Sequence, residues 1–333
     1  MDLKQRVIRA SFKTIRIVTP LKLRLIVRNM LGQSSYGNKK LEKLAERKFF
    51  SQSTVTYKVF GYELRMPEHH HIQSILEREP LRENLLAQAA KVLFKEANSE
   101  FIDVGANIGD TAAVVYSEAE VAPTSILIEP STYFYEFLQE NQKLFPNSTI
   151  LKKFVAQEFP LRQLSGSLHH WGGTAKFIEN GSEYVGDQID LNDLISNNTK
   201  LVKIDCDGLD FKILKSVVPR IEKRQPAFYY ENEITTRQQL EDALDVSEHF
   251  KAAGYVHAIV ARNCGTLIYA GKLDDHFVDV LNLQFALHAQ GLRSSIYYTD
   301  VIVFSANHQK EFSETLEGVR RSQKEIISAE RNM

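Results

Sequence analysis

Cysteine is scarce in this chain, with Cys206 and Cys264 the only two among 333 residues. Two cysteines cannot build a disulfide framework, so the sequence predicts a protein of the reducing cytoplasm. Also missing is any run of about 18 uncharged apolar residues, so no membrane-spanning helix is expected. The net charge is −1. No overall charge therefore draws the chain toward nucleic acid, and we expect no nucleic-acid partner.

The charge is nevertheless uneven, because residues 1–31 carry eight basic residues against one acid, Asp2. Apolar residues interleave with these charges, and Pro20 divides the segment in two. One interpretation is an amphipathic helix on an anionic surface, which predicts peripheral contact with the inner face of the membrane. A basic helix packed on its own domain, or against a protein partner, explains the same pattern, and these interpretations together rank higher.

Three apolar strand-like segments each end in residues suited to binding a ligand. Residues 101–105 end in a glycine-spaced turn, Gly105 to Gly109, that opens a helix-compatible segment at 111–119. Such a turn presents backbone N–H groups and the positive end of a helix to an anion. Residues 125–128 lead into Glu129, and an acid at this strand tip accepts hydrogen bonds from ribose hydroxyls. Residues 201–204 lead into an acidic turn that ends at Gly208.

The sequence around these segments resembles a known family. The stretches that carry the resemblance are "FIDVGANIGDT", "IEPSTYFYEFLQEN" and "VKIDCDGLDFKILKS", in this order. They are similar to the FkbM-type family of S-adenosylmethionine-dependent methyltransferases, and the likeness covers residues 100–305. One position departs from the pattern, because the family has Asp-x-Glu-Gly where this chain has Asp205-Cys206-Asp207-Gly208.

The resemblance implies S-adenosylmethionine as the cofactor. It places Gly105, Asn107 and Gly109 around the methionine part of that cofactor, with its carboxylate facing N–H groups at the helix start. It further implies that Asp103 contacts the amino group, directly or through water, and that Glu129 binds the ribose diol. The acceptor that it implies is a hydroxyl group of a sugar, a glycan or a secondary metabolite, which makes the protein an O-methyltransferase.

A hydroxyl acceptor must lose a proton, so a base near the transferred methyl group assists the reaction. The candidates are Asp205, Asp207, Glu231 and His170, with His169 beside it. Asp205 ranks first because it stands at the carboxyl end of a strand, where sheets of this kind bind their ligands.

Two histidine-containing segments have competing interpretations. The stretch "SGSLHHWGGTAKF", residues 165–177, has an aromatic residue and two glycines that suit a mobile cover over a flat or sugar-like acceptor. An ordinary packed tryptophan with solvated histidines ranks slightly higher. His69, His70 and His71 point to different sides, so a solvated triplet is expected, and no metal site is predicted.

The pattern of elements predicts a doubly wound α/β fold. Strands are expected at 101–105, 125–129, 149–155, 201–205, 226–233, 255–261 and 299–305, and helices at 110–119, 132–144, 209–219, 236–253 and 276–288. This alternation predicts a seven-stranded, mostly parallel sheet. The resemblance implies that the last two strands pair antiparallel. The resemblance implies the Rossmann-like class I methyltransferase fold.

The predicted organisation has four parts. They are a basic extension at 1–50, a hairpin and helix at 51–99, the methyltransferase domain at 100–306 and a charged helix at 307–333. Within the second part, residues 53–66 are expected to form two strands that meet near Gly61, and residues 72–96 a single helix.

Two other functions remain alternatives. An NAD-dependent oxidoreductase requires G-x-G-x-x-G after the first strand, and the chain has G-x-x-x-G there. A non-catalytic scaffold that keeps the fold predicts a blocked cofactor cleft, and the glycines and Glu129 argue against it.

Overall fold

The computed structural model describes residues 53–156, 165–171, 173–184, 186–221, 224–291, 296 and 298–330. The basic segment 1–31 and the predicted extension 1–50 lie outside this part of the chain. Within it, no helix is both long enough and apolar enough to cross a membrane.

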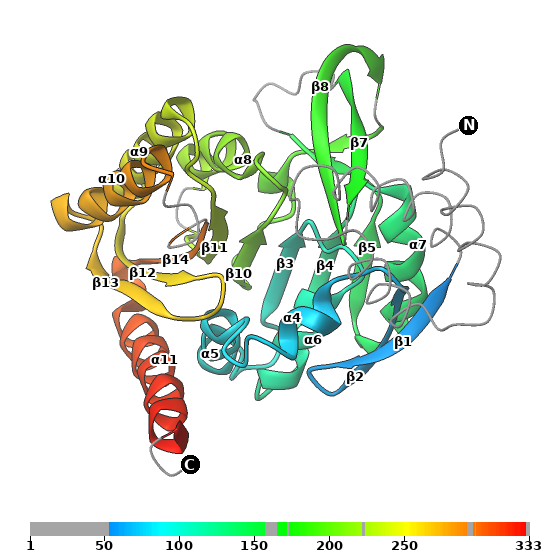
Figure 1. Ribbon diagram of the computed structural model, residues 1–333, viewed down its shortest axis with the longest axis horizontal. Helices are drawn as coiled ribbons and strands as arrows, with labels where there is room; N and C mark the ends of the chain where they lie inside the picture. The colour runs from blue at the N-terminus through cyan, green and yellow to red at the C-terminus, as the bar shows by residue number, and fades with distance from the viewer. Residues whose placement is uncertain are drawn as a thin grey trace, which may run out of the picture. The chain divides into compact units, whose positions relative to one another are not determined.

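An eight-stranded sheet forms the centre of the fold (Figure 1). Its strands, in spatial order, are β13 (Leu267–Lys272), β12 (Tyr255–Arg262), β14 (Thr299–Ser305), β11 (Ala227–Asn232), β10 (Thr199–Ile204), β3 (Glu100–Val104), β4 (Thr124–Ile128) and β5 (Ser148–Leu151). The five strands from β11 to β5 are parallel, and β14 is antiparallel to both of its neighbours. The order reverses beside β3, which creates the switch point at which such sheets bind ligands.

The doubly wound class is confirmed, but the count of seven strands was wrong. The eighth strand, β13, lies in a segment for which only a helix was predicted. It is an edge strand that pairs with β12 alone, and its residues are half-buried or exposed. A strand without a fully buried face shows no clear alternation of apolar and polar residues, so the pattern did not reveal it.

Alternation of side chains along the central strands supplies two separate cores. Phe101 and Leu201 face a core with α5 (Asn84–Leu93), α6 (Asp110–Glu118), α7 (Thr132–Asn141) and α11 (Gln309–Glu330). Ile102 and Val202 face a second core with α8 (Asp210–Val217), α9 (Arg237–Ala252) and α10 (Asp275–Ala289). Helices therefore cover both faces of the sheet, as its parallel strands require.

The helix predicted at 72–96 is two helices, α4 (Ile72–Leu76) and α5. Pro80 lacks a backbone N–H and disfavours helical geometry in the residue before it, so the helix is interrupted. Glu83 then takes a left-handed conformation, with φ 63°, directly before α5. Because of this break, the residues between the two helices lie near the carboxyl ends of the central strands.

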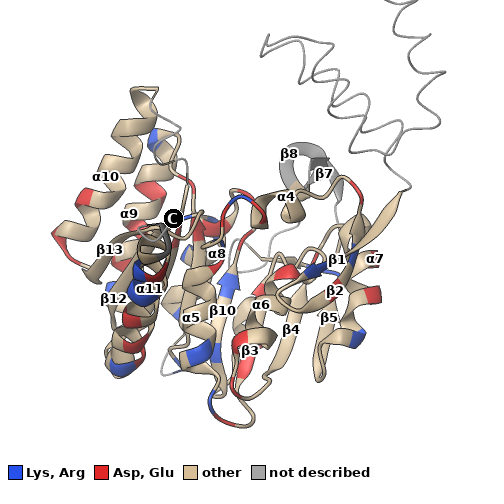
Figure 2. Ribbon diagram, turned by 60° about the horizontal axis from the view of Figure 1, so that its bottom comes forward, with Lys and Arg blue, Asp and Glu red and all other residues tan. Residues whose placement is uncertain are grey.

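Shorter elements surround the sheet. The predicted hairpin is β1 (Thr54–Val59) with β2 (Tyr62–Pro67), and a second hairpin joins β7 (Ser165–Trp171) to β8 (Thr174–Tyr184). Two short strands, β6 (Phe154–Val155) and β9 (Gln188–Ile189), pair in parallel. The final helix, α11, packs against α5 and carries basic and acidic residues mixed along its length (Figure 2).

We predict that Gly105→Ala destabilises the protein more than Gly61→Ala. Both glycines have a φ near +90°, which costs an alanine about 1–2 kcal/mol. A Cβ on Gly105 meets the backbone oxygen of Asp205 at 1.9 Å, whereas a Cβ on Gly61 meets nothing within 4 Å. The clash adds about 1–3 kcal/mol. Urea unfolding of the two variants measures the difference, and equal losses would contradict the close contact of β3 with β10.

Candidate active site

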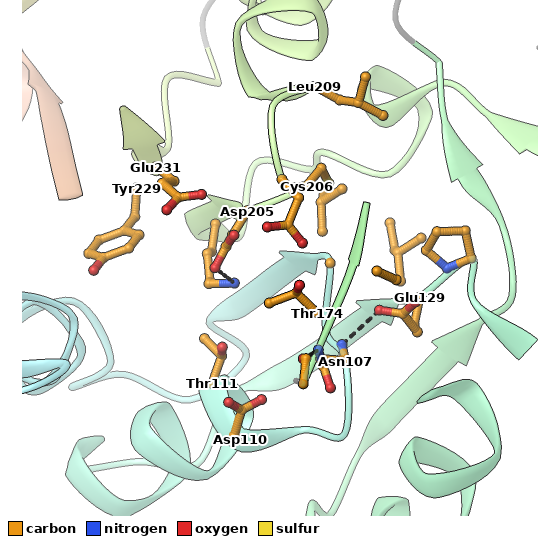
Figure 3. A pocket seen from close by; sticks show the side chains of 18 of the residues that line it. Asn107, Asp110, Thr111, Glu129, Thr174, Asp205, Cys206, Leu209, Tyr229 and Glu231 are labelled. Carbon is orange, nitrogen blue, oxygen red and sulfur yellow. Dashed lines mark hydrogen bonds and ion pairs between the residues drawn. The ribbon is translucent and has the colours of Figure 1, made fainter. Parts of the chain in front are cut away.

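A cavity of about 420 Å³ opens at the carboxyl ends of β3, β4, β10 and β11. Its size falls within the range of pockets that bind small molecules. Figure 3 shows the side chains of Asn107, Glu129, Asp205 and Glu231 around it, drawn from four different strand ends. Open space at this position does not agree with the blocked cleft that a non-catalytic scaffold predicts.

Most of the predicted site residues meet at this cavity. Those that line it are Gly105, Asn107, Glu129, Asp205, Asp207 and Glu231. Asp103 and Gly109 do not line it. His169 and His170 belong to β7, and their side chains lie outside the described part of the chain.

Glu129 follows β4 and is 4% exposed. Its two carboxylate oxygens accept hydrogen bonds from the backbone N–H groups of Asn107 at 2.9 Å and Ser131 at 2.8 Å. Burial raises the pKa of Glu129 to about 7, although both amides oppose the shift. Each oxygen accepts one of these bonds and has a second lone pair, so the carboxylate retains capacity for a ligand.

Backbone N–H groups of the glycine turn donate hydrogen bonds within the chain, which the sequence did not predict. The N–H groups of Gly105 and Ala106 both donate to the Ile128 carbonyl, and that of Asn107 donates to Glu129. Directly before α6, the N–H group of Gly109 donates to the Ala106 carbonyl at 2.8 Å. These donors, which were expected to face the carboxylate of a ligand, have partners within the chain.

Lys203 is a basic residue that the sequence analysis did not single out. It lies on β10, is 3% exposed, and lines the cavity. Its Nζ is 3.3 Å from Asp103 Oδ1 and 3.3 Å from Asp205 Oδ2. Although burial opposes its charge, Asp103 and Asp205 raise the pKa of Lys203 well above its usual range.

Asp103 is the buried partner in this arrangement. It pairs in register with Lys203 across the parallel strands β3 and β10, and it is 0% exposed. Apart from the Lys203 ammonium, its carboxylate oxygens have no hydrogen-bond partner among the described residues. Burial raises the pKa of Asp103 to about 6, with Lys203 opposing the shift. Its position suits a residue that holds Lys203 rather than one that touches a ligand.

Two further acidic residues line the cavity on the next two strands, β11 and β14. Glu231 on β11 pairs in register with Asp300 on β14, and both line the cavity. Burial, with Asp205 next in effect, raises the pKa of Glu231 well above its usual range. Burial also raises the pKa of Asp300 to about 7. Glu231 was predicted from the sequence, whereas Asp300 was not. Asp300 is the second residue of β14 and is brought to the site by the antiparallel pairing of β14 with β11.

The segment between α4 and α5 completes this side of the cavity. The Arg82 guanidinium contacts Glu83 at 3.2 Å and donates a hydrogen bond to the Tyr298 hydroxyl at 3.3 Å. All three residues line the cavity. The sequence did not reveal Arg82 and Glu83, because they lie about 120 residues from the acidic turn after β10, inside a segment that was predicted to be helical.

The prediction of a solvated histidine triplet was wrong for His70. This residue lines the cavity, and its Nε2 lies 3.3 Å from Asn107 Oδ1. Burial lowers the pKa of His70 to about 4, so it is neutral at physiological pH. The Asn107 side chain also donates to the Gly173 carbonyl at 2.6 Å, which connects the β7–β8 hairpin to the glycine turn.

Comparisons with known proteins agree with the motifs. A family described as the methyltransferase FkbM domain matches residues 103–257. This stretch begins at Asp103 on β3 and ends on β12, so it contains the glycine turn, Glu129 and the acidic turn after β10. Among curated proteins, none matches this chain.

Several solved structures are similar at low identity. One is a precorrin-6y C5,15-methyltransferase from Geobacter metallireducens, with 14% identity, a TM-score of 0.34, and coverage of 67% of this chain and 87% of that one. Another is TYW2 from M. jannaschii in complex with AdoMet, with 11% identity, a TM-score of 0.38, and coverage of 76% and 86%. A SAM-dependent O-methyltransferase from Thermotoga maritima has 11% identity, a TM-score of 0.36, and coverage of 67% and 65%.

We predict that Lys203→Met destabilises the protein by about 3–5 kcal/mol, because it leaves the Asp103 carboxylate buried without its counter-charge. Adding Asp103→Asn to this variant recovers a large part of the loss, since the remaining group is neutral. Urea unfolding of the wild type, both single variants and the double variant gives the coupling energy. Additive losses would show that the two side chains do not depend on each other.

Proposed function

Because residues 103–257 belong to the methyltransferase FkbM domain family, we propose that this S-adenosylmethionine-dependent methyltransferase methylates a hydroxyl group of a sugar, a glycan or a secondary metabolite. The observation that supports this proposal is the position of the Asp205 side chain. It is a carboxylate at the tip of the strand beside the glycine turn, 45% exposed, and it lines the cavity while Lys203 holds it. Such a group is placed to take a proton from an acceptor.

The cavity fits S-adenosylmethionine in volume and in the chemistry of its walls. Glu129 has acceptor lone pairs for the ribose hydroxyls. Ile128, Phe154 and Val155 supply an apolar wall for the adenine ring. Since the turn's own N–H groups are largely engaged, the amino-acid end of the cofactor has to be met chiefly by side chains. Asp110 is an acid that suits its ammonium group.

When bound, S-adenosylmethionine supplies a methyl group already activated for transfer, so the protein has to orient the acceptor, exclude water and remove one proton. Asp205 accepts the proton of the acceptor hydroxyl in this scheme. Lys203 orients the Asp205 carboxylate through their ion pair. Glu231 lies beside Asp205 on the next strand, so its carboxyl group can hydrogen-bond a second acceptor oxygen.

The composition of the acceptor side supports a hydroxyl-rich molecule. Glu231, Asp300, Tyr298 and Arg82 surround it with hydrogen-bond donors and acceptors. Two adjacent hydroxyl groups of a sugar match such a set, because each hydroxyl both donates and accepts. The resemblance of the three motifs to the FkbM-type family points to the same class of acceptor.

We predict that the protein transfers label from [methyl-³H]S-adenosylmethionine to a glycan fraction of a cell extract, as an alkali-stable ether. Asp205→Asn lowers the rate about 10²–10⁴-fold, because it removes the base. Asp207→Asn serves as the matched variant and loses less, since Asp207 lies outside the contact with Lys203. Label on protein or nucleic acid instead of glycan, or a greater loss in Asp207→Asn, would contradict the proposal.

A further inference from the structure

The cavity has far more acidic than basic residues, and the proposed reaction uses only part of this excess. Eight carboxyl groups line it, from Glu83, Asp110, Glu129, Asp205, Asp207, Glu231, Glu233 and Asp300. The basic residues among its described lining are Arg82, Lys153 and Lys203. Two of these are already engaged, Lys203 by Asp103 and Asp205 and Arg82 by Glu79 and Glu83. Acidic groups therefore outnumber the basic groups of the described lining.

Three of these acids stand side by side on neighbouring strands, and we call Asp205, Glu231 and Asp300 the carboxylate row. Ile204, the last residue of β10, pairs in register with Tyr230, so the residues that follow are Asp205, directly after β10, and Glu231 on β11. Glu231 in turn pairs with Asp300 on β14. Because side chains alternate along a strand, residues in register share one face of the sheet. Figure 3 shows Asp205 and Glu231 projecting into the same space.

The row is only partly neutralised by the protein. The ion pair between Asp205 and Lys203 is shared with Asp103, so one ammonium faces two carboxylates. For Glu231 and Asp300, no ion pair within 4.0 Å occurs in the part of the chain that the structure describes. Burial raises the pKa of both groups, and for Asp300 the Arg82 guanidinium opposes the shift. A ligand that brings a positive charge would supply what the row lacks.

The cofactor and the product of methyl transfer differ in this respect. S-adenosylmethionine carries a positive sulfonium, whereas S-adenosylhomocysteine has a neutral sulfur and is otherwise the same apart from one methyl group. Asp205 is adjacent to the glycine turn, because its backbone oxygen approaches the Cα of Gly105 so closely that a Cβ there would lie at 1.9 Å. The row therefore begins where the cofactor cavity meets the acceptor side.

We infer that the carboxylate row makes this cavity selective for the cofactor, with its positive sulfonium, over the product, whose sulfur is neutral. The inference rests on the proposed function and deepens it, since it assigns to Glu231 and Asp300 a role in distinguishing the two ligands. The consequence is that product leaves readily after each turnover. The proton released by the acceptor hydroxyl passes to Asp205, so the row loses one negative charge in the same step in which the sulfur loses its positive charge.

Isothermal titration of the full chain with three ligands tests the inference without an acceptor. The ligands are S-adenosylmethionine, S-adenosylhomocysteine and sinefungin, in which an amine-bearing carbon replaces the methylsulfonium and restores the positive charge. S-adenosylmethionine is expected to bind at least about tenfold more tightly than S-adenosylhomocysteine, as one buried charge interaction of modest size allows. Sinefungin is expected to follow S-adenosylmethionine.

Glu231→Gln is expected to reduce the preference for S-adenosylmethionine several-fold, while Glu325→Gln, a neutralisation on the exposed face of α11, leaves it unchanged. Circular dichroism confirms that each variant is folded. The inference is overturned if S-adenosylhomocysteine binds as tightly as the cofactor, if sinefungin binds as weakly as the product, or if Glu231→Gln keeps the full preference. Failure of all three ligands to bind would instead overturn the proposed function.

Discussion

A single buried ammonium holds together the strand tips on which this site is built. Lys203 is 3% exposed and lies between Asp103 on β3 and Asp205 after β10. A charge so deeply placed is costly unless it is paired, and a carboxylate at the position of Asp103 is costly for the same reason. Each of the two charges offsets the free-energy cost of burying the other. The pair also fixes the orientation of Asp205 at the edge of the cavity.

The two halves of the sheet contribute different residues to the site. On one side of the switch point, β3 and β4 carry the glycine turn and Glu129, which are joined by the bond from the Asn107 N–H to the Glu129 carboxylate. On the other side, β10, β11 and β14 carry Asp205, Glu231 and Asp300. The polar residues of this second half lie on the face of the sheet that α5, α6 and α11 cover. Along the strands this face carries apolar core residues, and at the strand ends it carries the polar ones. The same strands therefore provide the core along their length and the chemistry at their ends.

The local sequence predicted the parts of this site that follow strands directly. Glycine spacing after β3, the acid after β4 and the acidic turn after β10 were all visible because each is a short motif attached to an apolar run. Lys203 was visible too, as a charged residue inside "VKID". Its role as an ion-pair partner could not be predicted, because it depends on the register of its strand with Asp103, a hundred residues earlier. Arg82, Glu83 and Asp300 reach the site only through the break at Pro80 and the antiparallel pairing of β14. No local pattern encodes such contacts, because they depend on packing between distant segments. The edge strand β13 was missed for a related reason, since a half-buried strand lacks the alternation by which strands are recognised.

A crystal structure with bound S-adenosylhomocysteine is the most direct test of the central claim, that the cavity between the glycine turn and Asp205 binds the cofactor and presents it to the carboxylate row. The account predicts a ribose hydroxyl within about 2.5–3.0 Å of a Glu129 carboxylate oxygen, adenine against Val155 and Phe154, and the sulfur facing Asp205. Density for the ligand elsewhere on the chain, or a ligand in this cavity with its sulfur turned away from Asp205 and Glu231, would contradict it.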